Sequence, residues 1–152
     1  MTPKQFKTDI LPLPPEILQR NLEITIAVDI MFVNNLPFLV SLSNNIMFTT
    51  VEYLHDRKKQ SISKALSTIN NVYKRRGFKV VQCNMDNEFI PLTGDLMEMG
   101  IIINPTSANE HVPSIERRIR VIKERSRSLR HNLPYKHIPK LMIIELVKFT
   151  VR

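Results

Sequence analysis

Residues 22 to 33 form the stretch L-E-I-T-I-A-V-D-I-M-F-V, in which side chains of two kinds alternate. Alternation with a period of two is typical of a β-strand that buries one of its faces. One face would carry Leu22, Ile24, Ile26, Val28 and Ile30, and the other Glu23, Thr25, Ala27, Asp29 and Met31. The stretch therefore predicts a strand with a charged residue, Asp29, in its second half.

Two more strands are predicted directly after this one. The pair Asn34-Asn35 and the run Ser43-Asn44-Asn45 consist of turn-forming residues. An apolar run from Phe38 to Leu42 lies between them, and a stretch rich in β-forming residues extends from Ile46 to Leu54. Three strands joined by short turns predict an antiparallel β-meander.

The rest of the chain alternates helices and short strands. Helices are indicated where apolar residues recur every three or four positions, and strands where short apolar runs end in turn residues. In chain order the pattern predicts a helix from Lys59 that ends at Gly77, a strand from Phe78 to Cys83, a helix from Phe89 to Met99, a strand from Ile101 to Ile103, and helices from Ser114 to His131 and from Pro139 to Val151. The order β-β-β-α-β-α-β-α-α predicts an α/β fold.

Length and composition bear on the domain organisation. With 152 residues the chain is long enough for one hydrophobic core. Four prolines among the first 20 residues predict an irregular arm or linker over residues 1–20, followed by one domain over residues 21–152. The single cysteine, Cys83, excludes an internal disulfide and a multi-cysteine zinc site within this chain, and it is expected to be buried.

The chain shows no pattern typical of a membrane or secreted protein. The most apolar run, Ile24 to Val40, is interrupted by Asp29, Asn34, Asn35 and Pro37. A membrane helix needs about 20 predominantly apolar residues, and no signal peptide is evident. We therefore expect an intracellular protein without a membrane span.

The positive charge is confined to one part of the chain. The formal net charge is +8, with 22 Lys plus Arg and 14 Asp plus Glu. Residues 1–111 hold 11 basic and 11 acidic side chains, whereas residues 112–152 hold 11 basic and 3 acidic ones. Such an asymmetry indicates that the C-terminal part binds a polyanion or an anionic surface.

Three carboxylates lie at positions that suggest chemistry. Asp29 interrupts a strand expected to be central, Asp86 directly follows the fourth strand, and Glu116 lies in the first turn of the longest helix. Each has a simpler explanation: a hydrogen-bonded or edge-strand aspartate, a turn residue, and an acid that stabilises a helix N-terminus. Alternatively they are ligands of a cation, because a buried charge is costly unless it is paired or bound to an ion.

The order of these carboxylates resembles that in the catalytic cores of retroviral and retrotransposon integrases, which have the ribonuclease H-like fold. The matching segments are I-A-V-D-I-M-F-V-N-N with Asp29, V-V-Q-C-N-M-D-N-E-F with Asp86, and I-I-I-N-P-T-S-A-N-E-H-V-P-S-I-E-R-R-I-R-V-I-K-E-R with Glu116. The motif at residues 86–89 is most similar to that of the Ty1/copia-type integrases, and the resemblance spans about residues 20–150. It implies a five-stranded mixed sheet with helices on both faces.

The resemblance also implies an activity and a site. Integrases are polynucleotidyl transferases with endonuclease activity that process DNA ends and join them to target DNA by two-metal phosphoryl transfer. Asp29, Asp86 and Glu116 would be both the catalytic residues and the ligands of two Mg²⁺ or Mn²⁺ ions, with Asp29 binding both ions. Water and then a DNA 3′-hydroxyl would be the nucleophiles, so no protein nucleophile is expected.

Partners and a location follow from the same resemblance. The partner would be DNA, in the form of element ends and target DNA, and a homo-oligomer is expected. The zinc module and the C-terminal domain of such integrases have no counterpart in this sequence. The expected location is the nucleus or a cytoplasmic virus-like particle.

The longest helix provides an argument that does not depend on the resemblance. Its expected core face consists of Ile115, Ile119, Ile122, Leu129 and Leu133. Within about 40° of Glu116 on the helical wheel lie Arg120, Lys123, Arg127 and Arg130, which we call the cationic stripe. Solvated surface charge is the simpler explanation, but the alignment with Glu116 favours contacts to the DNA backbone.

Other polar residues near these elements are assigned less specifically. Asn87, beside Asp86, is a further expected DNA contact, and His111 precedes the longest helix where it could order the loop or touch a phosphate. Arg117, Arg118 and Arg125 point away from the stripe, and we expect them to be ordinary surface charge or contacts to a second chain.

Two departures from the family pattern leave other functions open. No glycines separate Asp86-Asn87 from Glu88-Phe89, and the 29 residues between Asp86 and Glu116 are fewer than retroviral cores usually carry. A DNA-binding or assembly module that has lost catalysis is one alternative. A ribonuclease H-type nuclease, which shares the metal site, is another.

Overall fold

The strand β1 (Glu23–Val33) lies at the centre of a five-stranded sheet with the order β3-β2-β1-β4-β5. The computed structural model of the chain describes residues 13–105 and 113–151. The strand β1 pairs antiparallel with β2 (Leu36–Ser43), which pairs antiparallel with β3 (Thr49–Tyr53). On its other side β1 runs parallel to β4 (Lys79–Met85), which runs parallel to β5 (Ile102–Pro105). The predicted meander and mixed sheet are confirmed.

A tight hairpin turn sets the register of β1 and β2. Asn34 and Asn35 connect the strands with positive φ angles of 49° and 61°. Positive φ at both central residues is the backbone of a type I′ turn, which matches the twist of the strands, and asparagine tolerates it better than most residues. The pairing therefore begins at Val33↔Leu36 and places Asp29 opposite Val40.

One face of the sheet is covered by α2 (Lys59–Arg75), the 3₁₀ helix η1 (Asn87–Leu92) and α3 (Thr93–Glu98). Ile24, Ile26 and Val28 of β1 are buried on this face, as their alternation predicted. The helix predicted from Phe89 to Met99 is only partly α-helical. Pro91 lies inside η1 and has no backbone amide, which favours the short 3₁₀ geometry at this point.

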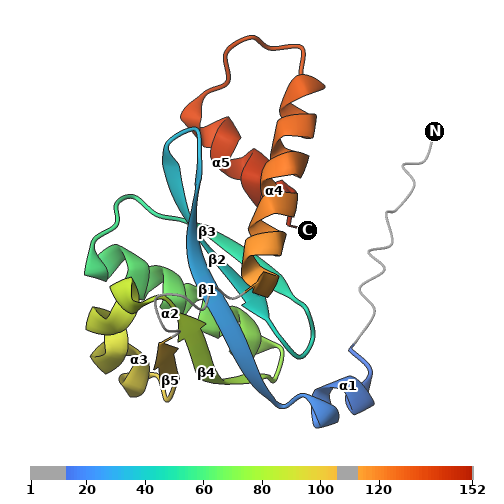
Figure 1. Cartoon of the computed structure of the whole chain (residues 1–152). Helices are drawn as coiled ribbons and strands as arrows, with labels where there is room; N and C mark the ends of the chain where they lie inside the picture. The colour runs from blue at the N-terminus through green and yellow to red at the C-terminus, as the bar shows by residue number, and fades with distance from the viewer. Residues whose placement is uncertain (1–12, 106–112, 152) are drawn as a thin grey trace, which may run out of the picture.

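The opposite face is covered by α4 (Pro113–His131) and α5 (Lys140–Phe149), which Figure 1 shows together on one side of the sheet. Ile115 and Ile122 of α4 are buried as predicted, while Ile119, Leu129 and Leu133 are only partly buried. Ser126 is buried as well, which the apolar pattern did not indicate. Its hydroxyl donates to the Ile122 carbonyl at 2.8 Å, so the helix itself supplies its hydrogen-bond partner.

The structure corrects two predictions, one about the N-terminal arm and one about the start of the third strand. Residues 15–20 form a short helix, α1 (Pro15–Arg20), where the prolines predicted an irregular arm, because Pro15 lies in the first turn, where no amide donor is required. The third strand begins at Thr49 and not at Ile46, since Met47 has a positive φ of 54°. Residues 1–12 of the predicted arm lie outside the described residues, so the domain boundary at residue 20 stays a prediction.

No helix in the described ranges is long and apolar enough to cross a membrane.

We expect the attachment of α4 to the sheet to depend on Ile122, which is 2% exposed in the cluster that joins α4 and α5 to β1, β2 and β3. Ile122→Ala should lower the free energy of unfolding by about 2–5 kcal/mol, because it leaves a cavity in a packed core. Urea denaturation measures the change. The control is Leu141→Ala on α5, where the side chain is 70% exposed, and its effect should stay within about 0.5 kcal/mol. Equal effects of both changes would contradict this account of the core.

Candidate functional site

Asp29 lies near the end of the central strand β1, on the sheet face that α4 covers. The parallel pairing between β1 and β4 ends at Ala27↔Asn84, so Asp29 lies two residues beyond the last pair. The amide of Ile30 donates to Asp29 Oδ1 at 2.7 Å, so the aspartate accepts a hydrogen bond from the backbone just past this point. Asp29 is half-buried. It is therefore a hydrogen-bonded strand aspartate, which was one of the simpler interpretations of this residue.

Asp86 lies just after β4, at the position that corresponds to Asp29 of β1. It directly follows the strand, two residues beyond Asn84, and its carbonyl accepts the amide of Phe89 at 3.0 Å at the start of η1. Asp86 is exposed and serves as a turn residue in the backbone. Because β1 and β4 are parallel neighbours, their C-terminal ends lie side by side, and equal offsets from the last pair place Asp29 and Asp86 at the same level of the sheet.

Glu116 approaches this end of the sheet from the first turn of α4. Its neighbour Ile115 is buried against the core, while Glu116 itself is exposed. Burial raises the pKa of the Asp29 carboxyl, the hydrogen bond from Ile30 lowers it, and the charges of Asp86, Glu88 and Glu116 each raise it. The structure therefore places Asp86 and Glu116 within electrostatic range of Asp29.

These carboxylates do not form a complete metal-binding site in the structure. Among the described residues, no three His, Cys, Asp or Glu side chains are close enough together to hold a metal ion. The donor chemistry nevertheless fits Mg²⁺ or Mn²⁺, because hard cations prefer carboxylate oxygens and Asp29 carries an electrostatic cost that a cation would relieve. Asp86 and Glu116 are exposed, so an ion from solvent can reach them.

Glu88 and Arg57 also lie near these carboxylates, and neither residue was assigned a role from the sequence. Arg57 Nη2 lies 2.6 Å from Glu88 Oε2, and its guanidinium lies 5.8 Å from the centroid of the Phe32 ring. Glu88 follows Asp86 and Asn87 in η1, and Asn87 is exposed. Arg57 precedes α2 in a polar segment without a recognisable motif, so only the fold brings this cation to the carboxylates.

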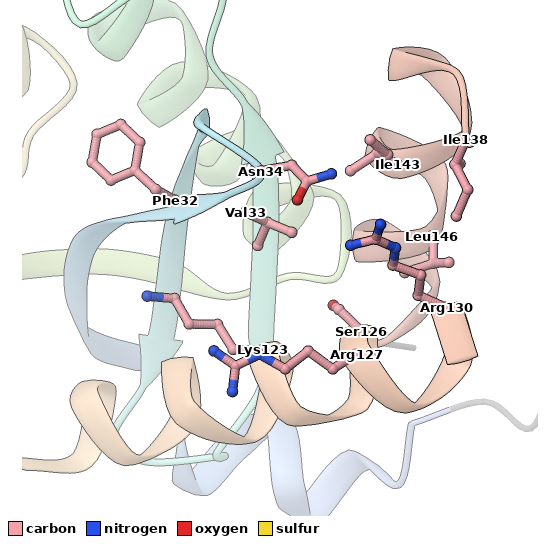
Figure 2. Close-up of a pocket in the computed structure, with 10 residues that line it drawn as sticks. All are labelled: Phe32, Val33, Asn34, Lys123, Ser126, Arg127, Arg130, Ile138, Ile143 and Leu146. Carbon is pink, nitrogen blue, oxygen red and sulfur yellow. The ribbon is translucent and has the colours of Figure 1, made fainter. Parts of the chain in front are cut away.

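The predicted cationic stripe forms a continuous surface on α4. A shallow groove, which we call the α4 groove, is lined by Glu116, Ile119, Arg120, Lys123, Glu124 and Arg127. A separate pocket beyond it is lined by Lys123, Arg127 and Arg130 together with residues of β1 and α5 (Figure 2). The stripe therefore leads from Glu116 to a second cavity, an arrangement that the helical wheel alone did not predict.

Other polar residues have structural positions. Arg125 is exposed, as expected of surface charge, and its Nη1 donates to the Thr150 carbonyl at 3.2 Å, which connects α4 to the end of α5. Cys83 is buried as predicted, and burial raises its pKa. His111 lies outside the described residues.

Comparison with known proteins supports the fold. No protein-family model matches the chain, and no curated protein sequence matches it. Its structure resembles 314 chains of solved structures. One is the catalytic core domain of BIV integrase, which superposes with a TM-score of 0.66 at 12% sequence identity over 84% of this chain and 80% of that chain. The chain therefore has the ribonuclease H-like α/β fold of an integrase catalytic core, as the carboxylate order implied.

The pH dependence of stability should show the cost of the Asp29 charge. Because the pKa of Asp29 is raised above its ordinary value of 3.8, the ionised carboxylate destabilises the folded state. Asp29→Asn keeps an acceptor for the Ile30 amide and removes the charge. We expect the variant to gain stability relative to the wild type as the pH rises through the raised pKa, and to lose that advantage below about pH 3.8. Thermal denaturation between pH 3 and pH 8 measures this.

Asp56→Asn is the matched control with the opposite sign. Hydrogen bonds from the Ser61 hydroxyl and the Lys58 amide lower the pKa of Asp56, so its ionised form stabilises the fold. This variant should be less stable than the wild type at neutral pH, and the difference should fade as the pH falls through the lowered pKa. The account of Asp29 is contradicted if Asp29→Asn shows the same pH trend as Asp56→Asn.

Proposed function

We propose that this chain is the catalytic core of a retrotransposon integrase of the Ty1/copia type. In this function it would process DNA ends and join them to target DNA as a metal-dependent polynucleotidyl transferase. The observation that supports the proposal is the electrostatic proximity of Asp86 and Glu116 to Asp29, which lies just past the end of the pairing between β1 and β4. The integrase-core fold and the cationic stripe beside Glu116 support it.

Each group of residues has a task in such a reaction. Asp29, Asp86 and Glu116 would hold two Mg²⁺ or Mn²⁺ ions. Bound there, the ions supply Lewis-acid stabilisation of the attacking and leaving oxygens of a phosphodiester. Arg120, Lys123 and Arg127 would bind phosphates along the α4 groove and so keep the scissile bond at the carboxylates.

Asn87 and Arg57 would act at the other edge of the same site. The exposed Asn87 follows Asp86 directly, where its amide could contact the DNA backbone. Arg57 would hold Glu88 through their ion pair, which keeps that carboxylate in place beside Asp29. The proposed reaction would be carried out by a homo-oligomer, in the nucleus or in a cytoplasmic virus-like particle.

A second candidate is a DNA-binding module that has lost catalysis. The Arg57–Glu88 ion pair favours it, because a guanidinium beside the carboxylates supplies part of the positive charge that metal ions would otherwise provide. Such a module would bind DNA by the same stripe and would not take up Mn²⁺. Calorimetric titration with Mn²⁺ separates the two candidates, and cleavage of an RNA–DNA hybrid would indicate the ribonuclease H-type alternative.

Asp86→Asn should abolish the proposed reaction. With short duplex ends and Mn²⁺, the wild type should nick or join strands, and the variant should be slower by at least about two orders of magnitude, because one carboxylate ligand is lost. A gel assay with labelled DNA ends measures both steps. Glu98→Gln on α3 is the control, since it removes an exposed carboxylate outside the site and should leave the rate unchanged. An Asp86→Asn variant as active as the wild type would refute the proposal.

The cationic stripe should dominate the salt dependence of DNA binding. Arg120→Ala removes a cation of the α4 groove, so the slope of log K against log salt should become shallower by about 0.9. Fluorescence anisotropy at several salt concentrations measures the slope. Arg75→Ala, which removes an exposed cation at the end of α2, should leave it unchanged. Equal changes for both variants would mean that DNA contacts the protein without preference for α4.

A further inference from the structure

A pocket with a volume of about 250 Å³ lies between the β1–β2 hairpin, α4 and α5 (Figure 2). We call it the hairpin pocket. Its walls are formed by Phe32, Val33, Asn34, Lys123, Ser126, Arg127, Arg130, Ile138, Ile143 and Leu146. Pockets for drug-sized ligands usually measure about 300–1,000 Å³, so this one suits a smaller group. Three of its residues, Lys123, Arg127 and Arg130, belong to the cationic stripe, and the others had no binding role predicted from the sequence.

One side of the hairpin pocket is strongly cationic. Lys123, Arg127 and Arg130 line it, and no acidic residue does. In the part of the chain that the structure describes, none of these three side chains forms an ion pair with an acidic side chain. Three neighbouring positive charges repel one another, so an anionic group that binds there relieves the repulsion. Arginine favours phosphate oxygens in particular, because it can donate two parallel hydrogen bonds.

The other side combines apolar residues with one amide. Val33, Ile143 and Leu146 provide a surface against which a flat ring can pack. The hairpin turn, with its positive φ at Asn34, holds that residue at the edge of the pocket. In Figure 2 the Asn34 amide and the Arg130 guanidinium lie close to Ile143. An asparagine amide offers a donor and an acceptor side by side, which matches the hydrogen-bonding edge of a nucleobase.

The hairpin pocket is continuous with the surface assigned to DNA. Lys123 and Arg127 line both this pocket and the α4 groove that begins at Glu116. At 1.5 Å per helical residue, Arg127 and Arg130 lie about 16–21 Å along α4 from Glu116. A DNA strand advances about 3.4 Å per nucleotide in a duplex, so this separation corresponds to roughly five or six nucleotides.

We infer that the hairpin pocket binds a single unpaired nucleotide of the DNA substrate, with its phosphate at Lys123, Arg127 and Arg130 and its base between Asn34 and the apolar wall. This inference rests on the proposed function, since it takes DNA as the ligand of α4. It goes beyond backbone contact, because the pocket would distinguish an unpaired base from a bare phosphate and would hold a frayed or flipped nucleotide several positions from the reacting bond.

The test compares two short duplexes that differ in one group. One carries a single unpaired adenine nucleotide, and the other carries an abasic nucleotide at the same place. Binding is measured by fluorescence anisotropy in the presence of EDTA, so that the carboxylate site takes no part. The wild type should bind the adenine duplex about tenfold more tightly, because only this duplex offers a base that can pack in the pocket.

Variants show whether the preference arises in this pocket. Asn34→Gly removes the amide and retains the positive φ, because glycine adopts this conformation without strain. Asn34→Gly should abolish the preference for adenine. Arg130→Ala should weaken the binding of both duplexes, because both carry the phosphate that Arg130 would contact. Arg117→Ala removes an exposed charge of the same helix outside the pocket and should weaken both duplexes equally while it retains the preference. Circular dichroism melts confirm that each variant is folded.

The outcomes separate this inference from the proposed function. A wild type without preference for adenine, or a preference that survives Asn34→Gly, would overturn the assignment of the pocket. Binding of free deoxyadenosine monophosphate that competes only with the adenine duplex would support it. If the protein prefers the adenine duplex but does not nick or join DNA with Mn²⁺, the assignment of the hairpin pocket is supported and the proposed catalytic activity is contradicted.

Discussion

The parallel pairing of β1 with β4 is the constraint on which the rest of the site depends. It places Asp29 and Asp86, 57 positions apart in the sequence, at one level of the sheet. The pairing stops at Ala27↔Asn84. Asp29 lies two residues further along β1, and Asp86 lies two residues past Asn84, directly after β4 ends at Met85.

The helix α4 has two different sides. Ile122 packs into the cluster that joins α4 and α5 to β1, β2 and β3, and Ile115 is also buried. Ser126 can be buried because its hydroxyl donates to the Ile122 carbonyl within the helix. The side next to this buried face carries the cationic stripe. Arg125 adds a hydrogen bond from the middle of α4 to the end of α5. Because Glu116 and the stripe belong to one helix, the helix geometry sets the spacing between them.

The charges of the molecule are separated in space as well as along the chain. Asp29, Asp86, Glu88 and Glu116 gather at the C-terminal end of the parallel strands, where burial and mutual repulsion raise the pKa of Asp29. Arg57 compensates part of this charge through Glu88, while its guanidinium lies over the ring of Phe32. Phe32 also borders the hairpin pocket, so one exposed ring lies between the acidic cluster and the cationic cavity. A polyanion bound along α4 would meet both regions.

Much of this protein could be predicted from its sequence, and the remainder required the fold. Local patterns determine the strands and helices, since alternation of period two, helical spacing and turn residues act over a few neighbours, and they identify Asp29, Asp86, Glu116 and the cationic stripe. They could not indicate Arg57, the buried Ser126 or the hairpin pocket. Those features depend on distant segments that only the sheet order and the packing of α4 and α5 bring together. The sequence by itself determined which residues carry the charge, whereas the tertiary structure decided which of them meet, because contacts between distant segments are set by the whole core and not by any local pattern.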